Sequence, residues 1–410
     1  MTSVAIVSLN YAPDEHGVAP YSTGLARGLA ARGHRVRLLT GFPYYPRWRL
    51  PESYRRFRRG LAHTEREEGV DVTRLWHHVP RRSTGVGRVV HEASFAVHAA
   101  VRAFLDDARP DVVVGVSPSL LSLGAARLWA SRAKVPLGVV VHDLYGRSTS
   151  EAGAVGGGRV AAAERALLAR ADGVAVIHES FRDHLAEVYG IPPERTTVIR
   201  NWVHVGGSPS VDQRDARVEL GWPTGGIVAL HAGNMGVKQD LVNVVEAARI
   251  AQHRHEPVHF VLMGDGATRP EVARRAAGLT HVSVVGPVTR ELLPTALGAA
   301  DVLVVNERPG MLGMSLPSKL TSYFCAGRPV VAAAHRDSST AAELAASRGG
   351  CLVEPGDPLA LLRAVVDLGG DPVRAAELAR AGLRYAHEEL GQERALAAYD
   401  RWLHDLGGAR

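Results

Sequence analysis

Short apolar runs rich in β-branched residues alternate with helical patterns along the whole 410-residue chain. Strands that are each followed by a helix pair in parallel, and the helices then cover both faces of the sheet. The alternation therefore predicts an α/β fold with doubly wound parallel sheets. Strands are expected over residues 4–9, 36–40, 70–75, 111–116, 137–142, 174–177 and 197–200, and then over 227–231, 258–263, 282–285, 301–305, 330–333 and 350–353.

The alternation is interrupted in the middle of the chain, between residues 201 and 223. A Gly-Gly-Ser-Pro-Ser cluster at 206–210 breaks any periodicity there and is typical of a linker or turn. With 46% hydrophobic residues, a chain of this length can bury two cores of ordinary size. We therefore expect an N-terminal domain at 1–205, a second domain at 206–385, and a C-terminal helix at 386–410 that packs back on the first domain.

Composition indicates where such a chain works. No apolar run approaches the roughly 20 residues that a membrane span needs, and the N-terminus lacks the basic start of a signal peptide, which predicts a cytoplasmic protein.

The net charge of +6 is spread thinly, and no basic groove is interleaved with aromatic residues, so no nucleic-acid partner is expected. Cys325 and Cys351 lie in ordinary helix and strand contexts, which favours neither a disulfide nor a thiolate metal site.

One segment departs from this even distribution of charge. Within residues 47–59, Trp48, Tyr54 and Phe57 stand among six arginines. Such interleaving suits the surface of an anionic membrane. An exposed basic loop is an equally good interpretation. Peripheral contact with the inner face of the membrane through this segment is therefore one of two alternatives.

Ligands of open α/β sheets bind beyond the carboxyl ends of the strands, so the loops after the expected strands are the candidate sites. After the first strand, Gly17 precedes a helix whose N-terminal N–H groups suit a phosphate, although a plain tight turn fits equally well. His142 and Asp143 stand at the carboxyl end of the strand at 137–142, and Glu307 follows the strand at 301–305, so all three are candidate site residues.

A glycine-rich turn in the second half carries Gly233, Asn234 and Lys238 before an expected helix. A flexible cation beside closely approaching backbone is what a pyrophosphate leaving group needs. Neither the dinucleotide fingerprint nor a Walker lysine motif is present. The turn therefore predicts a phosphate site of another kind.

Further loops complete the candidate site in the second half. Ser318 and Lys319 begin a helix, and a cation at this place is informative in a chain whose other basic residues are nearly all arginine. Gly264 and Val288 each follow a strand, and the backbone around Val288 could pair with the edge of a nucleobase. Plain strand-ending turns would look the same, so the interpretation depends on the whole set of loops.

Taken in order, these segments resemble glycosyltransferase family 4, the retaining enzymes of GT-B architecture, and especially the branch that builds bacterial polysaccharides such as colanic acid. GT-B enzymes have two Rossmann-like domains that face each other across a cleft. The matching segments cover nearly the whole chain and are Asn10-Tyr11-Ala12-Pro13, Gly17-Val18-Ala19-Pro20-Tyr21-Ser22, Pro43-Tyr44-Tyr45-Pro46, His142-Asp143-Leu144-Tyr145, Gly233-Asn234-Met235-Gly236, Lys238-Gln239, Pro317-Ser318-Lys319-Leu320 and Ala326-Gly327-Arg328-Pro329-Val330-Val331.

The resemblance implies transfer of a sugar from a nucleoside-diphosphate sugar to a saccharide, a lipid-linked saccharide or a small-molecule hydroxyl. The acceptor attacks on the face that the phosphate leaves, which retains the anomeric configuration without the paired carboxylates of a hydrolase. Lys238, with the helix start at Ser318 and Lys319, would stabilise the phosphate charge. His142 could hydrogen-bond the donor sugar or the acceptor hydroxyl, or be a satisfied structural histidine. Asp143 could orient the acceptor or hold its own loop together, and Glu307 could serve the donor sugar. No metal and no cofactor are expected, since the donor is a co-substrate.

The sequence departs from the family pattern at two places. The paired glutamates of the family align with Met314 and Ser322, and Ser322 would hold the donor ribose more weakly than a glutamate. Asn234 stands where many members carry an arginine. Two other interpretations therefore stay open, a sugar-nucleotide epimerase of the same architecture and a catalytically silent module that binds sugar nucleotides.

Overall fold

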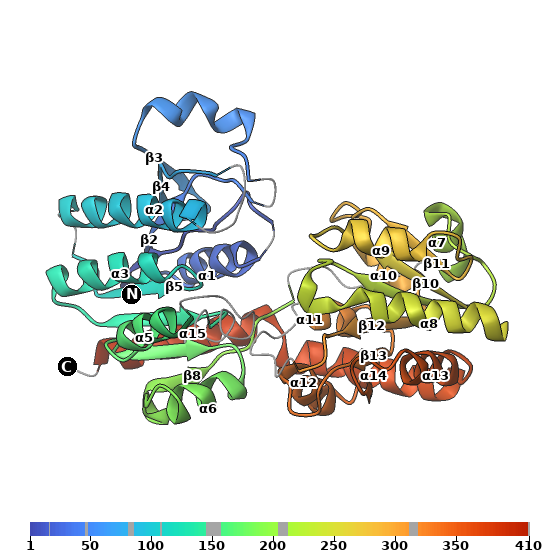
Figure 1. Ribbon diagram of the computed structural model, residues 1–410. Coiled ribbons are helices and arrows are strands. Elements are labelled where there is room, and N and C mark those ends of the chain that lie inside the picture. The colour runs from blue at the N-terminus through green and yellow to red at the C-terminus, as the bar shows by residue number, and fades with distance from the viewer. Residues whose placement is uncertain are drawn as a thin grey trace. The chain divides into compact units, whose positions relative to one another are not determined.

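The computed structural model describes residues 1–15, 17–45, 48–80, 86–106, 109–144, 157–203, 212–310 and 319–408. The chain forms two compact units, Met1–Arg200 together with Glu393–Arg410, and Asn201–Gln392. Each unit is built on one largely parallel sheet covered by helices (Figure 1). The predicted α/β fold class is confirmed.

The sheet of the first unit has eight strands in the order β3-β4-β2-β1-β5-β6-β7-β8. All neighbours pair in parallel except β3 and β4. The strands are β1 (Ser3–Val7), β2 (Arg35–Gly41), β3 (Ala62–Glu67), β4 (Val70–Leu75), β5 (Val112–Val116), β6 (Leu137–Val141), β7 (Gly173–Val176) and β8 (Thr196–Val198). The central strands are completely buried because helices lie on both faces, which is why they consist of aliphatic runs.

Strand β3 was not predicted from the sequence. It lies at the edge of the sheet, antiparallel to β4, and its residues Ala-His-Thr-Glu-Arg-Glu alternate between exposed and half-buried. The strand therefore has no apolar run. The signal that could have found it is the two-residue hairpin turn of Glu68 and Gly69, which both have positive φ angles.

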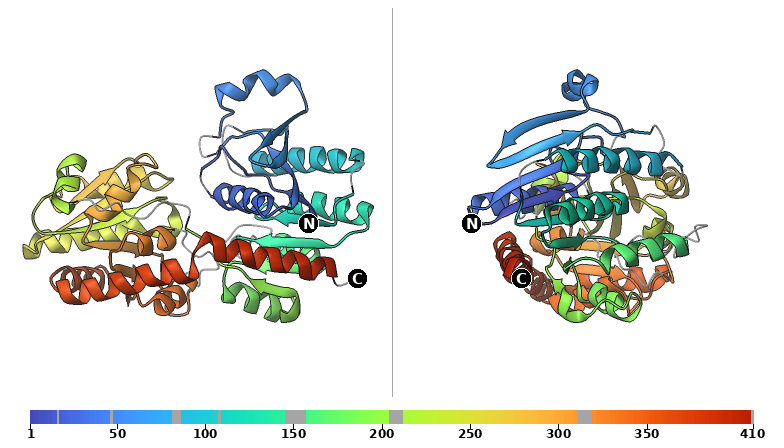
Figure 2. Two further views of the ribbon diagram at one scale, coloured as in Figure 1. Left: turned by 180° about the vertical axis from the view of Figure 1, so that it is seen from behind. Right: turned by 90° about the vertical axis from the view of Figure 1, so that its left-hand side faces the viewer.

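Helices cover both faces of this sheet (Figure 2). On one face lie α1 (Ala19–Ala31) and α15 (Gln392–Gly408), and on the other α2 (Val86–Leu105), α3 (Leu120–Ala133) and α5 (Gly157–Leu168). Helix α6 (Glu179–Glu187) packs beside β7 and β8. The C-terminal helix α15 is anchored by Trp402, whose indole lies against Gly138 of β6 and Gly173 of β7. His34 Nε2 is 2.9 Å from an Asp400 carboxylate oxygen.

The sheet of the second unit is entirely parallel, in the order β11-β10-β9-β12-β13-β14. Its strands are β9 (Ile227–Ala232), β10 (Val258–Met263), β11 (Val282–Val285), β12 (Val302–Asn306), β13 (Val330–Ala333) and β14 (Gly350–Val353). Its helices are α7 (Gln213–Leu220), α8 (Leu241–Arg254), α9 (Arg269–Ala276), α10 (Leu293–Ala299), α11 (Lys319–Cys325), α12 (Ser339–Ser347), α13 (Pro358–Gly369) and α14 (Pro372–Glu389). One apolar core lies on each face of the sheet.

Short 3₁₀ helices complete the described structure: η1 (Glu52–Arg59), η2 (Pro193–Arg195) and η3 (Val237–Gln239). Among the described helices, none combines the length and the apolar character that crossing a bilayer would require.

Candidate functional site

Strands β9 and β12 are neighbours in the second unit, and the chain leaves them toward opposite edges of the sheet. The connections from β9 lead to β10 and β11, while those from β12 lead to β13 and β14. Such a reversal is the place where open α/β sheets bind ligands, beyond the carboxyl ends of the two strands. The loops after β9 and β12 carry Gly233 and Glu307, so the candidate site begins there.

The loops after β9 and β10 touch through their backbones. A Cβ on Gly264 would lie 1.8 Å from the Gly233 carbonyl oxygen, and the φ angle of Gly264 is +146°. The Met235 amide donates to the Asp265 carbonyl over 2.8 Å, which ties the same two loops together. A side chain at Gly264 would force them apart, so glycine is required here. The bare backbone of Gly233 is thereby held at the carboxyl end of β9.

Lys319 reaches this backbone from the start of α11. Its Nζ lies 3.3 Å from Nε2 of His231, a fully buried side chain of β9. The same Nζ would lie 3.9 Å from a Cβ placed on Gly233. Burial and the charge of Lys319 lower the pKa of His231 well below its usual value, so the imidazole is neutral. Burial also lowers the pKa of Lys319, to about 7, and the nearby Glu307 carboxylate opposes this shift.

Glu307 follows β12 directly, and hydrogen bonds hold both its backbone and its side chain. Its amide donates to the Ala333 carbonyl of β13 over 2.9 Å. Its carboxylate accepts a hydrogen bond from the hydroxyl of Thr340, in the first turn of α12. Thr340 was not predicted as part of the site, because nothing local in the sequence relates it to a residue on another strand. The carboxylate is thus oriented near the Lys319 ammonium.

Asn306, the last residue of β12, holds the loop that carries Lys238. Its amide group donates to the carbonyls of Gln239 and Asp240 over 2.9 and 3.0 Å, and it accepts from Asn243 over 2.8 Å. The Arg308 amide donates to the Lys238 carbonyl over 2.9 Å. The backbone at Lys238 is therefore attached to the end of β12, while its side chain is half-buried.

The first unit has its own reversal of strand order, between β1 and β5. Gly17 lies just before α1, and its φ angle is +65°. The buried ring of His142, after β6, stacks on Tyr21 in the first turn of α1 with 5.4 Å between the ring centroids. The His142 amide donates to the Ser117 hydroxyl over 2.9 Å. The predicted residues Gly17 and His142 are thus at the same helix start, with the half-buried Asp143 next in the chain.

Asp14 is a buried acid in the same region that sequence reasoning missed. Its carboxylate accepts from the amides of Tyr44 and Tyr45 at 3.5 and 3.4 Å. Burial raises the pKa of Asp14 to about 6, despite these hydrogen bonds and the charge of Arg74. The Asn10 amide donates to the Tyr44 hydroxyl over 3.1 Å. An acid in the loop after the first strand was the available signal.

Known proteins resemble this chain in sequence or in fold. Residues 16–202 match the family described as "Glycosyl transferase 4-like domain", and residues 226–371 match "Glycosyl transferases group 1". The colanic acid biosynthesis glycosyl transferase WcaI of Escherichia coli is 30% identical over 338 residues, which cover 79% of this chain and 81% of that protein. The chain belongs to glycosyltransferase family 4. It is a glycosyltransferase, as its sequence predicted.

Other relatives extend the comparison of this glycosyltransferase. A D-inositol 3-phosphate glycosyltransferase of Xylanimonas cellulosilytica is 31% identical over 299 residues, 68% of each chain. Among solved structures, the sucrose-phosphate synthase of Thermosynechococcus elongatus has a TM-score of 0.75 at 19% identity, with both chains covered completely. HepE of Anabaena, solved with UDP and glucose, has a TM-score of 0.71 at 16% identity over 98% of this chain and all of that one. These structures show the same GT-B fold.

The other predicted donor residues of the glycosyltransferase lie on the glycine loops, on α11 and after β11. Asn234 is exposed, and its side chain borders Gly236 and Gly266 in the two glycine loops. Ser322 is half-buried one turn after Lys319 in α11. Val288 follows β11, two strands from β9, and packs against the hydrophobic core.

Ser318, a predicted donor residue, and Met314, which aligns with one of the family's paired glutamates, lie outside the described residues. Within the described ranges, no group of three or more His, Cys, Asp or Glu side chains could hold a metal ion. The roles of the placed residues in donor binding stay predictions.

Proposed function

We propose that this glycosyltransferase moves a sugar from a nucleoside-diphosphate sugar to a hydroxyl acceptor with retention of the anomeric configuration. The observation that carries the proposal is the ammonium of Lys319, placed between the Gly233 backbone, the neutral His231 ring and Glu307 at the reversal of the sheet. That position suits the diphosphate of a donor, because backbone and cation meet at the carboxyl ends of β9 and β12.

The Lys319 ammonium would act on the leaving group. When the bond between the anomeric carbon and the phosphate oxygen breaks, negative charge grows on the nucleoside diphosphate. A cation that is already desolvated and oriented stabilises this charge more than one in water. Lys238, in the loop attached to Asn306, would supply a second positive charge. We propose no metal and no cofactor for this step.

The acceptor side of the proposal rests on the first unit. His142, held by Ser117 and stacked on Tyr21, would hydrogen-bond the transferred sugar or the acceptor hydroxyl. Asp143 would orient that hydroxyl. In this proposal Glu307, fixed by Thr340, serves the donor sugar.

The names of the relatives support one class of acceptor. WcaI is named for colanic acid biosynthesis, which supports a saccharide or lipid-linked saccharide acceptor in polysaccharide assembly. A small-molecule acceptor is the second possibility. We further propose that the protein works in the cytoplasm at the inner face of the membrane, where residues 47–59 add positive charge.

Release of nucleoside diphosphate from UDP-, GDP- and dTDP-sugars, measured in EDTA, tests the proposal. Lys319→Ala should lower turnover of the active donor by about two orders of magnitude, the usual effect of losing a charge-stabilising group. Arg254→Ala, which removes an exposed cation at the end of α8, is the matched control and should keep wild-type turnover. Equal rates in wild type and Lys319→Ala would contradict the proposal. Conversion of the donor sugar without acceptor would indicate an epimerase instead.

A further inference from the structure

Helix α2 presents an apolar face to solvent. Its inner face packs on the sheet through residues at four-residue spacing, His91, Phe95, Ala99 and Ala103. A surface helix usually carries polar residues on the opposite side. Here that side is made of Val86, Val90, Val97, Val101 and Phe104, which are 79%, 44%, 60%, 52% and 64% exposed. These side chains lie on one outward stripe because their spacings of four, seven, four and three residues match the helical repeat.

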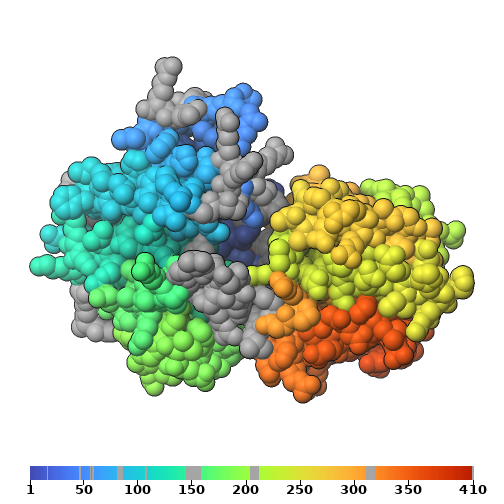
Figure 3. Space-filling view, viewed as in Figure 1, coloured from blue at the N-terminus to red at the C-terminus, as the bar shows by residue number. Residues whose placement is uncertain are grey.

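Helix α3 continues this apolar surface. It packs beside α2 (Figure 1) and adds Leu121 and Leu128, which are 42% and 60% exposed. The guanidinium of Arg132 lies 4.4 Å from the ring centroid of Phe104, so the two helices also meet at their C-terminal ends. We call this surface, made of the stripe on α2 with Leu121 and Leu128, the α2/α3 face. Figure 3 shows the two helices, coloured cyan to turquoise, open to the viewer.

The charges around the α2/α3 face are mostly positive. Helices α2 and α3 with the residue that follows each carry the cations Arg88, Arg102, Arg127, Arg132 and Lys134 and the acids Glu92 and Asp106. Both acids are ion-paired: a Glu92 carboxylate oxygen lies 3.5 Å from Nε of Arg88, and an Asp106 carboxylate oxygen lies 3.1 Å from Nη1 of Arg37.

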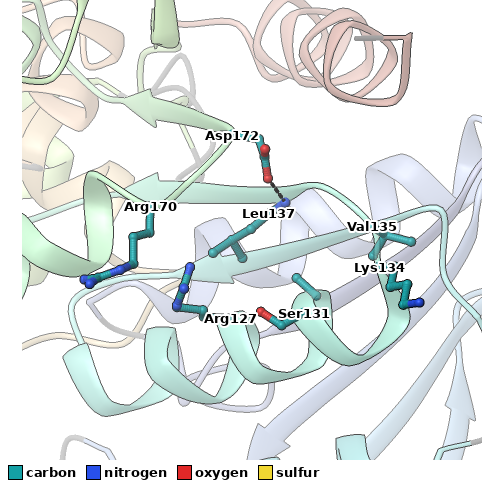
Figure 4. Close-up of a pocket in the computed structure, with 8 residues that line it drawn as sticks. Arg127, Ser131, Lys134, Val135, Leu137, Arg170 and Asp172 are labelled. Atoms are coloured by element: carbon teal, nitrogen blue, oxygen red, sulfur yellow. Dashed lines mark hydrogen bonds between the residues drawn. The ribbon is translucent and has the colours of Figure 1, made fainter. Parts of the chain in front are cut away.

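A pocket of about 390 Å³ beside α3 adds to this positive charge (Figure 4). Arg127, Ser131, Lys134 and Arg170 line it. Its one acid, Asp172, accepts the Leu137 amide over 2.8 Å. The surface is therefore apolar in the middle and cationic at its sides.

The aromatic residues of the basic segment 47–59 do not form such a surface. The Tyr54 ring lies 6.2 Å from that of Phe42, and the Arg74 guanidinium lies over it at 5.4 Å. Phe57 stacks on His63 with 3.9 Å between centroids. The Trp48 ring lies 5.2 Å from that of Tyr44 and 5.4 Å from that of His91. All three aromatic rings therefore pack against the protein, so the segment supplies charge and the apolar anchors must come from elsewhere.

We propose that the α2/α3 face docks on the surface of an anionic phospholipid bilayer. Valine, leucine and phenylalanine side chains would enter the acyl boundary, while Arg127, Arg132 and Lys134 would meet lipid phosphates. A second copy of this chain is the less favourable occupant, because a symmetric contact would bring arginines against arginines. Docking on the bilayer would give access to a lipid-linked acceptor, and only this consequence rests on the proposed function.

Vesicle co-sedimentation tests the docking without donor or acceptor. The wild type should sediment with vesicles of equimolar phosphatidylglycerol and phosphatidylcholine, and much less with phosphatidylcholine alone. The combined variant Val97→Gln, Val101→Gln and Phe104→Gln should bind the anionic vesicles at least about tenfold more weakly, since each lost apolar contact weakens insertion. Arg127→Gln with Arg132→Gln should remove most of the preference for anionic lipid.

The matched control replaces three valines of similar exposure elsewhere, Val188→Gln, Val218→Gln and Val373→Gln, which are 55%, 65% and 68% exposed. It should bind like the wild type. Absence of wild-type binding, or an equal loss in the control, would overturn the proposal. A lipid-free dimer that the α2 variant dissociates would overturn it in favour of a second copy. Donor turnover without lipid, measured on the same variants, reports on the transferase proposal separately.

Discussion

Binding of a nucleoside diphosphate should draw a proton onto Lys319. Burial lowers the pKa of this ammonium to about 7 in the free protein, and the neighbouring His231 is neutral. A diphosphate at the Gly233 backbone would bring negative charge to the Lys319 Nζ, because that atom lies beside this glycine. Nearby negative charge favours the ammonium form and raises its pKa. Binding and protonation are therefore coupled.

The size of the coupling follows from the pKa of the free protein. One pH unit above a pKa of about 7, only about one chain in ten carries the ammonium before binding. Binding at that pH should take up roughly 0.9 proton if the pKa in the complex is well above 8. The affinity should then fall about tenfold for each further pH unit until the pKa of the complex is reached. Phosphate itself titrates near pH 6, so its own ionisation is complete in this range.

Isothermal titration calorimetry measures this uptake directly. UDP, GDP and dTDP are titrated above pH 7 in two buffers of different ionisation heat, and the difference gives the protons bound. Lys319→Ala should bind the preferred nucleotide more weakly, without proton uptake and with little pH dependence. The reasoning is refuted if the wild type takes up no proton, or if Lys319→Ala takes up as much as the wild type.

Further changes test other parts of the structure, each by denaturant unfolding. Asp14→Asn should gain roughly 2.5 kcal/mol relative to the wild type as pH rises from 4 to 7, because a carboxyl whose pKa is raised to about 6 destabilises the fold once it ionises. Gly264→Ala should cost about 2 kcal/mol and weaken donor binding, while Gly286→Ala, with open space around its Cβ, should cost little. Trp402→Ala should lower the free energy of unfolding by roughly 3–5 kcal/mol, because it leaves a cavity where the indole of α15 packs on Gly138 and Gly173. An unchanged unfolding midpoint in Gly264→Ala or Trp402→Ala would contradict the corresponding contact, and so would an Asp14→Asn variant whose stability follows that of the wild type from pH 4 to 7.

The parallel strands could be predicted because burial on both faces demands unbroken apolar runs. Strands such as β6 and β12 have every residue buried, and their sequences are almost wholly aliphatic. Strand β3 could not be found in this way, since it is an edge strand with charged residues on an alternating pattern. Only its turn at Glu68 and Gly69 carried a signal.

The candidate site was predicted as a set of loops but not as a set of contacts. Gly233 and Lys319 were each identified from local pattern, but the contact of Lys319 with His231 joins residues 88 positions apart. The burial that perturbs Lys319 and Asp14 likewise depends on distant segments. Local periodicity holds no information about such pairings, so the pKa shifts required the structure.

The retaining transfer is the central claim, and proton NMR of the first-formed product tests it most directly. With the active donor and water or a saccharide as acceptor, spectra recorded before mutarotation should show a product with the anomeric configuration of the donor, formed in EDTA and lost in Lys319→Ala. A product of inverted configuration, or one whose formation is unaffected by Lys319→Ala, would contradict the account.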